Sequence, residues 1–299
     1  MTLEQRTDTD TWDPGTSVGA TATLVAAARA AAAASPDALI DDPLAKPLVH
    51  AVGVAELSRW ADGDIDDEDP DVQWVLRGFV DLMAVRTRFF DDFLQDATDA
   101  GIRQVVNLAS GLDARSYRMA WPAGTRIFEL DQGPVIGFKT STLADLGVDT
   151  SAELHAVPID LRQDWPAALR ANGFDAQQPT VWLIEGLLPF LRPDAQDRLL
   201  DAVTELSVAG SRLGAEIFVP PSRELMEPVT RRWQSSGFSV QPQDLVYDED
   251  RSDVTVYLNA HGWSATTTTM RTLLARHGLS RRADDPLFTN NSYYTATRI

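Results

Sequence analysis

Cysteine is absent from this 299-residue chain. Its absence excludes disulfide bonds, thiolate metal ligands and a cysteine nucleophile, and it suits a protein of a reducing compartment. The sequence also lacks an apolar run long enough to span a bilayer. The first residues, MTLEQRTDTDTWD, contain neither the basic start nor the apolar core of a signal peptide. We therefore expect a cytoplasmic protein that has no membrane partner.

Positive charge is scarce. The chain has 26 Lys and Arg against 44 Asp and Glu, which gives a formal net charge of −18. Such a surface repels polyanions, and no cluster of basic residues offsets it, so we do not expect a nucleic-acid partner. The composition, 44% hydrophobic and 23% charged, is that of a globular protein with a sizeable core. We expect a single domain and favour a monomer.

The stretch from Gln104 to Phe138 carries the most informative pattern. A short apolar strand at 105–108 runs into a turn of small residues that contains Gly111, and a helix follows at 116–119. A second strand at 125–130 ends beside Asp131, about 20 residues after the glycine, where nucleotide-binding βαβ units place a ribose-binding acid. This order indicates a site for an adenosine-containing ligand.

The rest of the chain alternates strands with helices. The apolar pattern predicts strands at 105–108, 125–130, 154–158, 180–184, 212–218, 263–269 and 292–297. Helices are expected between them, at 135–146, 165–172, 193–208 and 271–277, and also over the ambiguous residues 253–261. The fold class that this alternation predicts is α/β, a doubly wound, mostly parallel, seven-stranded Rossmann-like sheet with N-terminal helices and a cap.

We divide the single domain into five parts. Residues 1–16 are expected to be a flexible tail, 17–100 an N-terminal helical part, 101–218 the cofactor-binding core, 219–261 a cap and 262–299 the closing strands. The helical part should contain an alanine-rich helix at 17–34, a short helix at 43–52 and a long helix at 72–97, with an acidic loop at 62–71. In the cap region Phe218, Met226, Trp233 and Phe238 could line an apolar pocket, although core packing is favoured for each.

Two charged residues stand out by position. Arg86 lies within the apolar stripe of the long helix, so its guanidinium needs either an internal ion pair or an anionic ligand. Asp160 follows the third strand, where it could contact a ligand or cap a helix. The four histidines, His50, His155, His261 and His277, offer no general base that can be placed from the sequence.

Seven segments together resemble a known family. They are SVGATATLVAAARA, DDPLAKPLV, AVRTRFFDDFL, RQVVNLASGLDARSYR, FELDQ, DLR and EGLLPFL. In this order they are similar to the S-adenosylmethionine-dependent methyltransferases of the leucine carboxyl methyltransferase type, in particular their actinobacterial branch. The resemblance covers nearly the whole chain and implies that S-adenosyl-L-methionine is the cofactor.

The resemblance also implies roles for individual residues. Arg86 would pair with the methionyl carboxylate, with Arg88 as the competing candidate, and Gly111 would allow close approach of the methionyl part. Glu185 would face the sulfonium and amino end or the incoming substrate. Arg29 stands where better-studied relatives have a lysine, which leaves its contact with the cofactor open.

The adenosine half of the cofactor has its own implied contacts. Asp131 would accept hydrogen bonds from the ribose hydroxyls, while Asp160 and Leu161 would bracket the adenine. The implied activity is methyl transfer to an oxygen of a small molecule, with a carboxylate preferred over a hydroxyl. A carboxylate needs neither a metal nor a general base, because methyl transfer from a sulfonium depends mainly on positioning and exclusion of water.

Two other functions compete with this one. An NAD-dependent oxidoreductase is disfavoured, because the turn has one glycine where a dinucleotide fingerprint has three. A cofactor-binding protein that has the fold but no turnover is also compatible with the sequence, although the methyltransferase is favoured.

Overall fold

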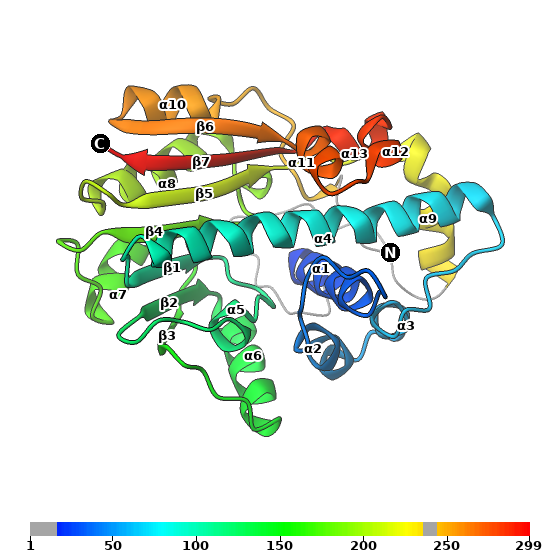
Figure 1. Ribbon diagram of the computed structural model, residues 1–299, viewed down its shortest axis with the longest axis horizontal. Coiled ribbons are helices and arrows are strands. Elements are labelled where there is room, and N and C mark those ends of the chain that lie inside the picture. The colour runs from blue at the N-terminus through cyan, green and yellow to red at the C-terminus, as the bar shows by residue number, and fades with distance from the viewer. Residues whose placement is uncertain (1–16, 236–243) are drawn as a thin grey trace.

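Seven strands form one sheet in the order β3-β2-β1-β4-β5-β7-β6 (Figure 1). The computed structural model describes residues 17–235 and 244–299. The expected tail at 1–16, the part of the cap at 236–243 and Phe238 lie outside the described residues. Within the described parts, the sheet confirms the predicted seven-stranded doubly wound fold.

The first five strands are parallel to one another, and β7 runs antiparallel to both of its neighbours, β5 and β6. Their bounds are β1 Gln104–Leu108, β2 Arg126–Asp131, β3 Glu153–Pro158, β4 Thr180–Ile184, β5 Arg212–Ile217, β6 Trp263–Thr269 and β7 Ser292–Arg298. The chain builds outward from β1 to β3 and then returns to the other side of β1 to form β4. This reversal leaves a crevice at the carboxyl ends of β1 and β4, where open α/β sheets bind ligands.

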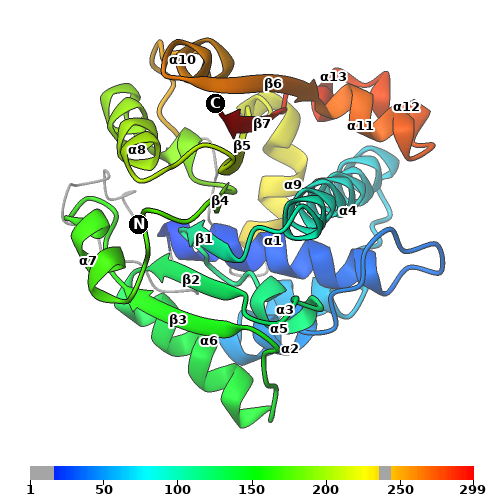
Figure 2. The ribbon, with the colours of Figure 1, turned by 60° about the vertical axis from the view of Figure 1, so that its left-hand side comes forward.

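Alternate residues of the central strands face opposite layers of helices. Val105 belongs to a core shared with α1 (Ser17–Ala33) and α4 (Pro70–Asp99), whereas Val106 packs with α7 (Trp165–Ala171), α8 (Pro193–Glu205) and α10 (Val254–Ala260). Figure 2 shows the sheet between these two layers. The apolar runs that predicted buried strands therefore have one physical cause, burial on both faces.

The N-terminal helices build a scaffold on one face. Helix α4 begins at Pro70, where the Asp69 carboxylate accepts a hydrogen bond from the Asp71 amide as an N-cap. Helix α1 is alanine-rich and largely buried against α4 and two short helices, α2 (Ala45–Val52) and α3 (Ala55–Ala61). The sequence predicted all of these except α3.

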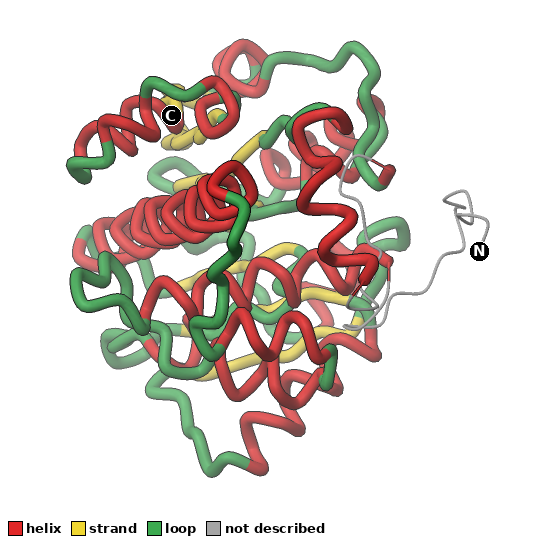
Figure 3. Tube along the Cα trace, turned by 90° about the vertical axis from the view of Figure 1, so that its right-hand side faces the viewer, coloured by secondary structure: helices red, strands yellow, loops and turns green. Residues whose placement is uncertain are grey.

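Six further helices and a 3₁₀ turn complete the described fold. They are α5 (Arg115–Arg118), α6 (Gly133–Asp145), α9 (Arg223–Ser235), α11 (Met270–Arg276), α12 (Ser280–Ala283), α13 (Pro286–Thr289) and a 3₁₀ turn at Leu188–Phe190. Of the expected cap, α9 lies against α4, whereas α10 packs on β6 and β7. Helices cover most of the side of the molecule that Figure 3 presents, with strands visible behind them. No helix in the described parts of the chain is long and apolar enough to cross a membrane.

Candidate functional site

A cavity of ≈ 260 Å³ lies beyond the carboxyl ends of β1, β2, β4 and β5. Residues of α1, α4 and α9 form its other walls. Its position matches the crevice that the strand order creates, so the fold itself places the candidate site.

The turn after β1 and the end of β2 are joined by hydrogen bonds. The Gly111 amide donates to one oxygen of Asp131 (2.7 Å), and the Gln132 amide donates to the other (2.7 Å). Gly111 has a left-handed φ of +48°, and a Cβ there would lie 3.2 Å from the Cβ of Ala22. Burial raises the pKa of Asp131, and the two amide hydrogen bonds oppose that shift. The backbone is thus held close to a buried carboxylate that lines the cavity.

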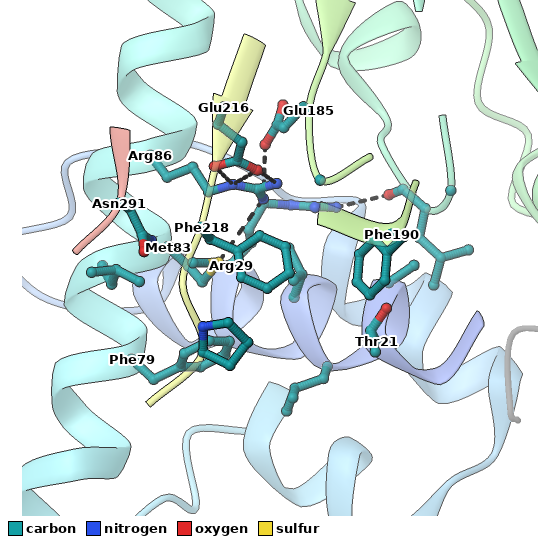
Figure 4. A pocket seen from close by; sticks show the side chains of 18 of the residues that line it. Thr21, Arg29, Phe79, Met83, Arg86, Glu185, Phe190, Glu216, Phe218 and Asn291 are labelled. Carbon is teal, nitrogen blue, oxygen red and sulfur yellow. Dashed lines mark hydrogen bonds and ion pairs between the residues drawn. The ribbon is translucent and has the colours of Figure 1, made fainter. Parts of the chain in front are cut away.

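Arg86 reaches the same cavity from α4. Its Nε donates to both oxygens of Glu216 (2.8 and 2.9 Å), its Nη2 also pairs with Glu216, and its Nη1 lies 2.9 Å from Glu185. Figure 4 shows both carboxylates directed at the guanidinium. Burial alone would lower the pKa of Arg86, but the two glutamates outweigh it and raise that pKa. Of the two alternatives for this arginine, the ion pair is therefore present, and the guanidinium still lines the cavity.

Arg115 is a second buried guanidinium that the sequence did not single out. It donates to Asp91 (2.6 Å), Asp113 (2.8 Å) and Glu185 (2.6 Å). Burial would raise the pKa of Asp113, yet the nearby cations, Arg115 first among them, lower it. Glu185 is consequently fixed between Arg86 and Arg115, one guanidinium on each oxygen.

Arg29 completes this part of the wall from α1. Its Nε donates to the buried carboxylate of Asp42 (2.9 Å) and its Nη2 to the carbonyl oxygen of Leu112 (2.7 Å). These contacts tie α1 to the glycine turn. Figure 4 shows Arg29 on the same side of the pocket as Arg86.

We call this part of the cavity the charged end. It comprises Arg29, Arg86, Asn107, Ser110, Gly111, Asp113, Arg115, Asp131, Glu185 and Glu216. Three guanidinium groups face four carboxylates, a formal charge of −1. A ligand with a net positive charge is therefore electrostatically favoured here.

The opposite part, which we call the apolar end, has a different chemistry. It comprises Trp60, Val75, Leu76, Phe79, Leu82, Met83, Phe190, Phe218, Val219, Met226, Val229, Trp233, Leu287 and Phe288. Trp60 and Trp233 meet edge to face, with ring centroids 5.9 Å apart. Figure 4 places Phe79 and Phe218 below the Arg86 ion pairs, with Met83 beside them. The one cavity is therefore ionic at one end and apolar at the other.

The structure brings four of the predicted site residues together. Arg86, Gly111, Asp131 and Glu185 all line the cavity, and so does Arg29. Arg88, the competing candidate, lies outside it, half exposed and paired with Asp92 one turn away. This difference favours Arg86 over Arg88.

Asp160 and Leu161 are not among the residues that line the cavity. Asp160 pairs with Arg162 and accepts a hydrogen bond from the Gln132 side chain (3.2 Å), so it lies beside the strand end that carries Asp131. Its contact with a ligand remains a prediction. Within the described chain no histidine lines the cavity, and no group of three or more potential metal-ligating side chains is present.

Three site residues were missed, and one of them had a readable signal. Glu216 is a charge inside a buried strand, which resembles the signal that identified Arg86. Asp113 and Arg115 belong to the segment RQVVNLASGLDARSYR, but nothing in their spacing shows that they meet Glu185 and Asp91. Of the apolar candidates, Phe218, Met226 and Trp233 do line the cavity.

Comparison with known proteins gives a consistent picture. Residues 22–204 match the family model described as leucine carboxyl methyltransferase. A protein of Mycobacterium marinum is 52% identical over 97% of this chain and 98% of its own length, and one of Mycobacterium avium is 52% identical over 98% and 97%. Both carry the name "Putative S-adenosyl-L-methionine-dependent methyltransferase".

A solved structure with a lower similarity is that of a DUF574 family protein from Streptomyces avermitilis. It is 14% identical, covers 85% of this chain and 96% of that one, and aligns with a TM-score of 0.48. The fold assignment rests on the strand order described above.

Proposed function

This chain belongs to the leucine carboxyl methyltransferase family, and from that premise we propose that it transfers the methyl group of S-adenosylmethionine to a carboxylate oxygen of a small molecule. Membership makes it an S-adenosylmethionine-dependent methyltransferase. The acceptor and the methylated atom are the proposed part. One observation carries the proposal. The glycine turn at Gly111 is hydrogen-bonded to Asp131 at the end of β2, and both line a partly apolar cavity at the point where the strand order reverses.

The charged end fits the cofactor. Its formal charge of −1 complements a ligand that has a sulfonium, an ammonium and one carboxylate. Gly111 provides close backbone approach, and Asp131 provides acceptor oxygens for hydroxyl groups. We assign the ribose to Asp131, the methionyl carboxylate to Arg86 or Arg29, and the cationic centre to Glu185. Asp160 and Leu161 are assigned to the adenine because Asp160 contacts the residue after Asp131.

A carboxylate acceptor suits the groups that line the cavity. When bound, the cofactor supplies a methyl group on a sulfonium; the acceptor oxygen forms the new C–O bond as the C–S bond breaks, and the electron pair stays on sulfur. A carboxylate has no proton to lose in this exchange, whereas a hydroxyl needs a base. The described lining has no His, Lys, Cys or Tyr, and Asp113, Glu185 and Glu216 each already accept from an arginine.

Isothermal calorimetry tests the cofactor assignment. S-adenosylmethionine and S-adenosylhomocysteine should bind and NAD should not. Asp131→Ala should weaken S-adenosylhomocysteine binding by about 1.5–3 kcal/mol, the scale of a hydrogen bond to a charged group. Asp92→Ala, which removes an exposed carboxylate paired with Arg88, is the matched control and should leave affinity unchanged. If the two variants bind S-adenosylhomocysteine with equal affinity, Asp131 does not contact the cofactor.

Turnover requires a separate measurement. Incubation with S-adenosylmethionine and a panel of carboxylic acids, phenols and amines should give methyl esters from the acids alone. A protein that binds cofactor but yields no methylated product from any class would be the binding protein without turnover. Tight binding of NAD with no response to S-adenosylhomocysteine would instead support the oxidoreductase.

A further inference from the structure

We propose that the acceptor is a carboxylic acid with a long apolar chain, which places its carboxylate at the boundary between the charged end and the apolar end and its alkyl chain in the apolar end. The inference rests on the proposed function and adds the substrate class. It follows from the chemistry of the apolar end, from the position of Arg86 at its boundary and from the exposed apolar residue at its rim.

The apolar end is built by elements that are far apart in sequence. Phe79 and Met83 come from α4, Val229 and Trp233 from α9, and Phe218 follows β5. None of the fourteen side chains defined as the apolar end carries a charge or a hydroxyl group. The polar groups near it are few: the indole nitrogens of Trp60 and Trp233 belong to this end, and Thr21 and Asn291 also line the cavity. A sugar acid or an amino acid would therefore lose more hydration than these groups restore, whereas an alkyl chain would gain from burial.

Arg86 marks the boundary between the charged end and the apolar end. Its Nη1 lies 4.0 Å from the sulfur of Met83, which belongs to the apolar end, and 2.9 Å from Glu185, while its Nε and Nη2 pair with Glu216. The charged end and the apolar end therefore meet within one helical turn of α4, between Met83 and Arg86. An acid that spans this boundary keeps its charge among the polar groups and its chain among the apolar ones.

The rim of the cavity also favours an apolar ligand. Val219 is 52% exposed and lines the cavity together with Pro220 and Pro221. The other large exposed apolar residues of the described chain, Leu146, Val256 and Ile299, do not line it. Val219, Pro220 and Pro221 therefore give the cavity an apolar rim on this side.

The first experiment measures binding of acids to the protein saturated with S-adenosylhomocysteine, by calorimetry and by tryptophan fluorescence, since Trp60 and Trp233 line the apolar end. Across butanoate, hexanoate, octanoate and decanoate, affinity should rise about three- to fourfold for each added methylene. Decanedioate, which has the same length and a second charge at its far end, should bind at least a hundredfold more weakly than decanoate. A tripeptide that ends in leucine should also bind more weakly than decanoate.

A matched pair of variants tests whether the alkyl chain of the acid lies in the apolar end. Val229→Phe narrows the apolar end, and Val256→Phe makes the same change on the exposed face of α10. Val229→Phe should reduce decanoate affinity about tenfold or more and leave butanoate and S-adenosylhomocysteine unaffected, while Val256→Phe should change none of the three. Melting temperatures check that both variants fold. If Val229→Phe does not fold, the decanoate and decanedioate pair still decides the question with the unmodified protein.

Several results would overturn the inference. The first is an affinity for the acids that does not depend on the length of their alkyl chain. The others are equal affinities for decanoate and decanedioate, or a higher affinity for the leucine tripeptide than for decanoate. Any of these, together with normal S-adenosylhomocysteine binding, would leave the proposed methyl transfer intact. Failure to bind S-adenosylhomocysteine would count against the proposed function, and the acid series on the free protein would then test the apolar end by itself.

Discussion

The two ends of the cavity are held together by different forces. In the charged end each guanidinium has fixed partners: Arg86 has Glu216 and Glu185, and Arg115 has three carboxylates. In the apolar end the contacts are non-directional, as in the Trp60 and Trp233 pair. Directional pairs specify one arrangement, whereas apolar packing tolerates changes of shape at similar volume. Substitutions should therefore affect the charged end far more than the apolar end.

Breaking the charged end should have the largest effect. Arg86→Met leaves Glu216, which is 1% exposed, without its partner, and removing one member of a buried ion pair costs about 3–5 kcal/mol of unfolding free energy. Urea denaturation monitored by circular dichroism measures the loss. S-adenosylhomocysteine affinity of the folded fraction should also fall, because the proposed partner of its carboxylate is gone.

The double variant Arg86→Met/Glu216→Leu separates these two effects. Replacing both members of a buried pair by apolar side chains is often neutral for stability, so most of the lost free energy should return. Cofactor affinity should stay low. If affinity recovers along with stability, Arg86 is a structural residue only, and the ion pair accounts for its place in the apolar stripe.

The sequence predicted the fold well because the fold depends on local patterns. Strand and helix periods located all seven strands and the long helix, and the ambiguous residues 253–261 are the helix α10. Helices α3, α12 and α13, of seven, four and four residues, were not predicted. Each of them packs against neighbouring helices: α3 against α1 and α2, α12 against α11, and α13 against α4 and α12.

The site could be predicted only in part. Gly111 and Asp131 follow from the order of strand, turn and strand, and they do meet. The pairing of Arg115 with Glu185 joins residues 70 positions apart, and no spacing rule in the sequence shows it. The ion pairs of the charged end form between residues that are distant in the sequence, so they could be identified only from the structure.

A matched pair of glycine substitutions should have effects of intermediate size and tests the charged end at its backbone. Gly111 and Gly53 both have left-handed φ angles, +48° and +79°, so alanine should destabilise either site by about 1–2 kcal/mol. Only at Gly111 would the new Cβ have a close neighbour, at the cavity wall. S-adenosylhomocysteine affinity should therefore fall about tenfold, or about 1.4 kcal/mol, in Gly111→Ala alone. An equal loss in Gly53→Ala would attribute it to general destabilisation.

The smallest effect is expected at the boundary between the two ends. Met83 is buried in the apolar end with its sulfur 4.0 Å from Arg86, and Met83→Leu keeps a similar volume, so the unfolding free energy should change by less than about 1.5 kcal/mol. Cofactor affinity should not change, because Glu216 and Glu185 hold the guanidinium without help from the thioether. Calorimetry with S-adenosylhomocysteine checks this. A tenfold loss of affinity would mean that the apolar end positions Arg86, and that the two ends act as one unit.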